Sequence, residues 1–177
     1  MKKQMTLFAL LSILLMFGYA CSKSDDGQPD VQIDEKNLTD CPANANCTTI
    51  YQDNKEMDSL GWTKTGSKRL FTASVIYPGV TNKLYISVPM NSTSFSLGKA
   101  DVLKGGLGWI TACPACNMIG LKQIDGYAKG RKLSGDNNND KWILEAKIIR
   151  QAIDGSSYKD TLYVKQYFYK SASSDVN

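Results

Sequence analysis

Cysteine is the reactive residue type that stands out in this chain of 177 residues, because histidine is missing altogether. The lack of histidine excludes serine–histidine and cysteine–histidine nucleophile systems, histidine general bases and histidine metal ligands. Four of the five cysteines form two local groups, Cys41 with Cys47 and Cys113 with Cys116. Four cysteines allow three pairings. We expect disulfides, as in exported chains, and favour the local Cys41–Cys47 pairing because it requires the least coincidence in three dimensions.

The segment Cys113-Pro114-Ala115-Cys116 has the spacing of a thiol redox motif, in which a thiolate at a helix N-terminus attacks a disulfide. Residues 117–121 alternate like a strand, whereas a thioredoxin-like motif precedes an amphipathic helix. The two cysteine groups would also offer thiolates to Zn²⁺ or Cu(I), but the spacing of Cys41 and Cys47 exceeds that of zinc fingers. A redox or metal-binding function of the CxxC segment therefore stays as the alternative.

Carboxylate chemistry has no identifiable pair in the sequence. A glycosidase needs two carboxyl groups about 5 to 10 Å apart across a cleft, and Asp101, Asp125 and Glu145 are dispersed along the chain. Residues 136–140 imitate the first ligands of an EF-hand loop, but Lys141 stands where that loop needs a glycine. We therefore predict no catalytic and no metal-binding residues, and a protein that is not an enzyme.

The N-terminal residues have the pattern of a signal peptide. Lys2 and Lys3 precede an uncharged, mostly apolar run over residues 6–20. This run is shorter than the roughly 20 residues of a membrane-spanning helix. The small residues Gly18 and Ala20 stand before Cys21. We therefore predict that residues 1–20 are removed on export.

The residues around Cys21 resemble a bacterial lipobox. The acidic stretch that follows, over residues 22–27, is similar to the export tag of surface-exposed outer-membrane lipoproteins of Gram-negative bacteria. The resemblance covers residues 1–27 and implies that Cys21 carries a covalent diacylglycerol, the only non-protein group that we expect. It also implies an outer-membrane location through this lipid, with display at the cell surface favoured over the periplasmic side.

The rest of the chain divides into three parts. Residues 21–40 are polar and predict a flexible acidic tether after the lipidated cysteine. Residues 41–170 contain short alternating runs and predict a disulfide-braced β domain. Residues 171–177 are expected to be a disordered tail. Basic pairs such as Lys68-Arg69 are not interleaved with aromatic residues, so we expect no nucleic-acid partner.

Alternating residues predict individual strands. Runs over residues 69–77 and 84–88 predict a hairpin with a five-residue connection, and Asp125-Gly126 is suited to the two-residue turn of a second hairpin. Residues 141–153 fit both a strand and a helix, and we favour a strand because of their isoleucines and tryptophan. About seven strands follow, in an all-β fold with little helix. We predict a single antiparallel β-sandwich or small β-barrel.

The clearest strand, residues 161–169, supplies candidate contact residues. Its alternation places Tyr163, Tyr167 and Tyr169 outward. Tyrosine rings offer rigid amphipathic contact area, so we expect these residues to contact a glycan or a protein ligand of unknown identity. The preferred function is thus a binding or structural surface module, with an inhibitor or immunity-type lipoprotein as a further alternative.

Overall fold

The computed structural model describes residues 31–58, 61–116, 119–133 and 140–171. The predictions for the signal peptide, for Cys21 and for the first half of the tether concern residues 1–30 and lie outside the described residues. So do those for the polar turn at 134–139 and for the tail beyond residue 171. In the described ranges, no helix is both long and apolar enough to cross a membrane.

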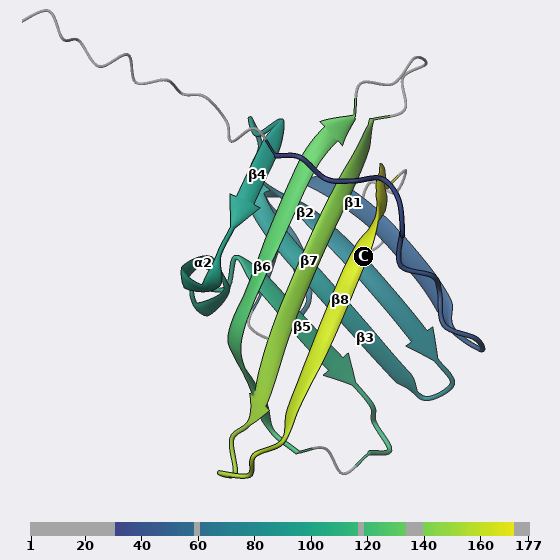
Figure 1. The fold of residues 1–177 in the computed structure, drawn as a ribbon, viewed down its shortest axis with the longest axis vertical. Helices are drawn as coiled ribbons and strands as arrows, with labels where there is room; N and C mark the ends of the chain where they lie inside the picture. Colours follow the sequence, from purple (N-terminus) through teal and green to yellow (C-terminus); the bar gives the residue numbers. More distant parts are fainter. Residues whose placement is uncertain (1–30, 59–60, 117–118, 134–139, 172–177) are drawn as a thin grey trace, which may run out of the picture.

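Eight strands form one sheet that curls into a half-barrel, with β4, β6, β7 and β8 in one layer and β1, β2, β3 and β5 behind them (Figure 1). Their order across the sheet is β4-β6-β7-β8-β1-β2-β3-β5. The strands are β1 (Asn46–Met57), β2 (Thr63–Tyr77), β3 (Val80–Pro89), β4 (Ser94–Leu97), β5 (Leu107–Ala112), β6 (Leu121–Leu133), β7 (Lys141–Ala152) and β8 (Lys159–Lys170). The short helix α2 (Lys99–Leu103) connects β4 to β5. The all-β prediction is confirmed.

The sheet is mixed, whereas the sequence predicted an antiparallel one. Strand β1 pairs with β2 in antiparallel orientation but with β8 in parallel orientation. The parallel register comprises only Ile50 with Tyr169 and Tyr51 with Lys170. Curling the sheet brings the first and last strands side by side, and this non-local contact leaves no local signal in the sequence.

Alternation along β7 builds the centre of the core. Trp142, Leu144, Ala146 and Ile148 are buried and point into the half-barrel, so residues 141–152 form the favoured strand and not the helix. Phe71 of β2 contacts four aromatic rings at centroid distances of 5.1 to 5.8 Å. Burial of such rings is the main stabilising term of the fold, at about 25 cal/mol per Å² of apolar surface.

Two predicted turns differ from the structure. The β2–β3 hairpin exists, but Pro78 and Gly79 alone connect its strands, and Gly79 has a φ of 81°. Asp125 and Gly126 do not form a turn, because they lie within β6 at a β-bulge between Gln123 and Asp125. A Cβ atom on Gly126 would lie 2.5 Å from the Lys147 carbonyl oxygen. This glycine therefore permits close strand approach at a bulge, which is another common use of Asp-Gly in a sheet.

Residues 31–42, here called the strap, run across the outside of the sheet (Figure 1). Val31 and Ile33 are buried against Ile143. The Thr39 N–H donates to the Lys165 carbonyl oxygen at 2.8 Å. The predicted flexible tether over 21–40 therefore differs from the structure in its second half. The alternation of Val31 and Ile33 is too short to stand out in a polar segment, yet it suffices to cover one apolar residue of β7.

Candidate ligand-binding site

The lower end of the half-barrel, where β7 ends and β8 begins in Figure 1, contains a buried arginine. Arg150 continues the inward alternation of β7 and is 6% exposed. Its Nε and Nη2 atoms donate to the two carboxylate oxygens of Asp160 at 3.1 and 2.6 Å. A buried charge without a partner costs several kcal/mol. The bidentate pair with Asp160 removes most of this cost and fixes the guanidinium plane.

Residues of two further strands complete a network around this arginine. The guanidinium carbon lies 3.4 Å from the centroid of the Trp109 ring, a cation–π arrangement. The Arg150 Nη1 atom donates to Thr111 Oγ1 at 3.2 Å. Trp109 Nε1 and Thr111 Oγ1 both donate to Asn82 Oδ1, at 3.2 and 2.8 Å. We call Asn82, Trp109, Thr111, Arg150 and Asp160 the Arg150 network.

Gln123 joins β6 to the edge strand β5 beside this network. Its side-chain amide is assigned from its neighbours: with the nitrogen facing the Leu107 carbonyl oxygen and the oxygen facing the Trp109 N–H, both atoms are paired at 3.0 Å, whereas the opposite orientation leaves both unpaired. These backbone groups belong to the edge strand β5, whereas Gln123 belongs to β6. The Gln123 side chain thus pairs two backbone groups of the edge strand β5 that face away from β3, and it fixes the position of Trp109.

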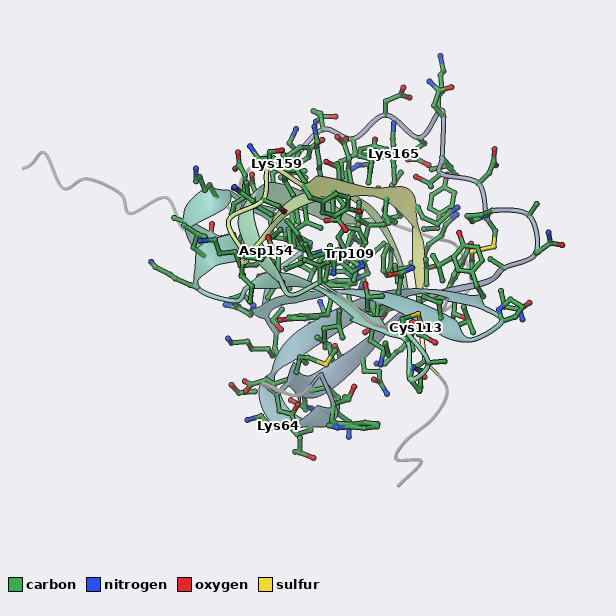
Figure 2. All side chains as sticks on the ribbon, turned by 90° about the horizontal axis from the view of Figure 1, so that it is seen from below. Lys64, Trp109, Cys113, Asp154, Lys159 and Lys165 are labelled. Atoms are coloured by element: carbon green, nitrogen blue, oxygen red, sulfur yellow. A yellow bond between two sulfur atoms is a disulfide. The ribbon has the colours of Figure 1, made fainter. Side chains whose placement is uncertain are left out.

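A cavity of about 590 Å³ opens beside the network. Trp109, Arg150, Leu121 and the two half-exposed residues Ile119 and Tyr158 line it, together with Ile110, Thr111 and Gly120. In Figure 2, which looks at the molecule from this end, Trp109 lies near the middle, between Asp154 and Cys113. The volume and the mixture of aromatic, aliphatic and polar walls are typical of small-molecule sites. We call it the lower cavity.

Both cysteine groups form disulfides, and the favoured local pairing is confirmed. Cys41 bonds to Cys47, and Cys113 bonds to Cys116. The second disulfide closes a turn directly after β5, near the lower cavity, with the Cys116 N–H donating to the Cys113 carbonyl oxygen. In this oxidised form each of the four sulfur atoms is bonded to another sulfur atom and offers no thiolate to a metal ion.

The three tyrosines predicted to contact a ligand do not line the lower cavity, and they have different surroundings. Tyr163 and Tyr169 are exposed. Tyr167 packs against the strap, and its hydroxyl donates to Glu35 Oε2 at 2.7 Å. This hydrogen bond raises the pKa of Tyr167 and lowers the pKa of Glu35. The row is therefore interrupted by the strap and does not offer three free rings to one ligand.

The dispersed carboxylates noted in the sequence take part in local hydrogen bonds. Asp101 accepts from the Gly98 N–H at the start of α2, at 2.8 Å. Asp125 accepts from the Gly126 N–H at the bulge, at 2.9 Å. Glu145 accepts from the Tyr127 hydroxyl at 2.7 Å, which together with burial raises the pKa of Tyr127 to about 12. Each of the three acids thus has its own local hydrogen bond, and the three do not meet at one site.

The Arg150 network was missed in the sequence, although one signal for it was present. Along β7, four apolar inward positions are followed at the same period by Arg150, and Asp160 precedes the apolar alternation of β8 in the same way. A charged residue in phase with a buried face needs a buried partner, so the pair could have been proposed. Comparison with protein-family models, curated proteins and solved structures finds no match, so the site is interpreted from its geometry.

Proposed function

We propose that this chain is a lipid-anchored, non-enzymatic binding protein of the bacterial outer membrane, and that it holds a small neutral ligand in the lower cavity. The observation that carries the proposal is the internally satisfied Arg150 network beside an open cavity of about 590 Å³. A rigid wall with its polar groups already paired is suited to holding a ligand, because little order is lost on binding.

The charges favour a neutral ligand. The guanidinium of Arg150 is compensated by Asp160 at 2.6 Å, so the wall that it forms carries no unpaired charge. Trp109 and Tyr158 offer aromatic surface, and Ile119 and Leu121 offer aliphatic surface. A ligand with one apolar face and several hydroxyl groups, such as a sugar ring, matches these walls, because amphipathic aromatic residues contact such faces well.

Titration with neutral sugars tests this proposal through intrinsic tryptophan fluorescence. We expect a saturable change with at least one of a panel of monosaccharides and disaccharides. The change should weaken at least tenfold in Tyr158→Ala, which trims an exposed side chain and leaves the Arg150 network intact. Trp62→Phe is the matched control, because Trp62 is 70% exposed and does not line the cavity. Unchanged binding in Tyr158→Ala, or no binding at millimolar sugar, would overturn the proposal.

The proposed location rests on the residues around Cys21 and is tested separately. In a Gram-negative host we expect the chain to label with radioactive palmitate and to fractionate with the outer membrane. Cys21→Ala should abolish the label and release the protein into a soluble fraction. Access of an added protease to intact cells distinguishes surface display from the periplasmic side. Soluble, unlabelled wild-type protein would exclude the lipid anchor.

A thiol-redox function of Cys113 and Cys116 is the second candidate, favoured by the exposure of Pro114, Ala115 and Cys116. Here the Cys113–Cys116 disulfide would oxidise a substrate with two thiols. One substrate thiolate attacks a sulfur atom of the disulfide, which forms a mixed disulfide and frees one cysteine thiolate. The second substrate thiol then displaces the other cysteine, which leaves a substrate disulfide and a reduced Cys113–Cys116 pair. A glutathione titration followed by alkylation and mass measurement decides. Reduction of this disulfide at cellular glutathione potentials would favour the redox function, and resistance would favour a structural brace.

A further inference from the structure

The wall of the half-barrel has a gap between β8 and β1. The two strands share only the register positions of Ile50 and Tyr51. Towards their N-terminal ends they diverge (Figure 1). Over residues 159–168, β8 therefore has no ladder partner in β1.

The strap closes this gap from outside and is fixed on both sides. On the β8 side, Thr39 exchanges two hydrogen bonds with Lys165, each 2.8 Å long, and its carbonyl oxygen accepts from Gln166 Nε2 at 3.1 Å. On the β1 side, the Cys41–Cys47 disulfide joins the end of the strap to the second residue of the strand. The first disulfide thus has a definite structural task, which is to hold the strap over the gap.

A second cavity, of about 160 Å³, lies beneath the strap, and we call it the strap cavity. Its inner walls are the apolar side chains of Ala73, Val75, Leu162 and Val164. The disulfide and Pro42 form its outer side. Asn82 of the Arg150 network also lines it, so this network stands between the strap cavity and the lower cavity.

We propose that the strap cavity is a second binding site, which takes an uncharged hydrocarbon group of about the size of a benzene ring. The strap cavity is open on one side and mainly apolar, with Thr49 and Ser74 at its polar margin. A hydrocarbon that fills such a pocket gains dispersion contacts with its walls and displaces water that the walls cannot hydrogen-bond well. Asp40 lines the strap side and is exposed. A carboxylate on the ligand would therefore be repelled, whereas a neutral ring would not.

The Cys41–Cys47 disulfide makes this site preformed. Since both the β8 contacts and the disulfide fix the strap, ligand binding does not have to order it. Cys41→Ser/Cys47→Ser should therefore weaken binding of the ring, while the hydrogen bonds of Thr39 still hold the strap to β8. Binding of the ring in the strap cavity therefore depends on the disulfide that fixes the strap.

Benzene is the probe for the test, with the protein purified from membranes of an expressing bacterium in a mild detergent. Methyl NMR should show saturable shifts at Val75, Leu162 and Val164. Ala73→Val adds two methyl groups to the cavity and should weaken binding at least tenfold. Ala112→Val makes the same change at an exposed position of β5 and should have no effect, which also controls for partition of benzene into the detergent.

Two further binding measurements make the result decisive. Benzoate should bind the unaltered protein at least tenfold more weakly than benzene, and this comparison needs no variant that could fail to fold. Tyr158→Ala, which trims only the lower cavity, should bind benzene like the wild type, so failure of the sugar proposal and failure of this one are separable. Three results would each overturn the strap-cavity site. They are equal affinity of the wild type for benzene and benzoate, equal affinity of Ala73→Val and the wild type for benzene, and the lack of a saturable methyl shift with benzene.

Discussion

Arg150 and Trp109 stack with the guanidinium carbon 3.4 Å from the ring centroid, although they belong to β7 and β5, which are not neighbours in the sheet. The contact spans the interior of the half-barrel near its open end. It joins the two layers at a place where β5 and β7 exchange no backbone ladder. The stack and the Asp160 pair therefore hold the two layers together at this end, as the apolar core does in the rest of the half-barrel.

Removal of the guanidinium should be costly. Arg150→Ala leaves the Asp160 carboxylate without its cationic partner and removes one of the two hydrogen bonds of the Thr111 hydroxyl, so we expect a loss of about 2–4 kcal/mol in the free energy of unfolding. Urea denaturation followed by circular dichroism measures it. Arg131→Ala is the control, because Arg131 pairs with the more exposed Glu35 and should cost about 0–1 kcal/mol. Similar losses in both variants would contradict the assigned importance of the Arg150 network.

Stability should fall in alkali through Tyr51. Burial, followed by the charges of Asp140 and Asp53, raises the pKa of Tyr51 to about 12 from 10. Because the folded state holds this proton more tightly than the unfolded state, its contribution is complete below pH 10 and is lost between pH 10 and 12. Denaturation at pH 9 and 11.5 measures the fall. Tyr51→Phe should reduce the loss of unfolding free energy between pH 9 and 11.5, and the change of the exposed Tyr158 to Phe should leave this loss as it is. A larger effect of Tyr158→Phe than of Tyr51→Phe would exclude Tyr51 as the group responsible.

Gln123 should control the seam between β5 and β6. Gln123→Ala removes both hydrogen bonds to β5 and should cost about 1–2 kcal/mol. The amide hydrogen of Trp109 should then exchange faster by at least tenfold, since its acceptor is the lost side chain. Lys122→Ala, at the exposed neighbouring position, serves as the control. Unchanged exchange at Trp109 would mean that β5 is held without this bridge.

The strap should open when its apolar anchor is removed. Ile33 is buried, so Ile33→Ser should lose about 1.5–3 kcal/mol of local packing. Trypsin should then cleave after the exposed Lys36 at a much higher rate than in the wild type. The matched change Ile153→Ser concerns an exposed isoleucine and should leave this rate as it is. Equal cleavage of both variants would show that the polar contacts and the Cys41–Cys47 disulfide hold the strap without the packing of Ile33.

The sequence was sufficient where burial follows a local period. The alternation of Trp142 to Ile148 and that of β8 predicted two central strands, and the short spacing of Cys41 and Cys47 predicted their pairing. It was insufficient where long-range contacts decide. The parallel pairing of β1 with β8 and the packing of Val31 on Ile143 depend on the curl of the whole sheet.

The candidate site was harder to predict for the same reason. Its members come from four strands, and only Arg150 and Asp160 break a pattern visible in one dimension. Trp109 and Asn82 look like ordinary strand residues until β5 and β3 are placed side by side. Asp125-Gly126 shows the converse error, since a dipeptide typical of turns serves here to let a bulged strand approach its neighbour.

The position of Val31 has a consequence for how the molecule would stand on a surface. Val31 packs beside Ile143 near the start of β7, whereas Arg150 and the lower cavity lie near the end of that strand. Ile143 and Arg150 are seven positions apart along the strand, a length of about 23 Å. The end of the described chain closest in sequence to Cys21 is thus opposite the lower cavity. In the proposed lipid-anchored form, the chain that comes from Cys21 would join the fold at the end opposite the lower cavity, so its point of entry leaves the mouth of that cavity clear.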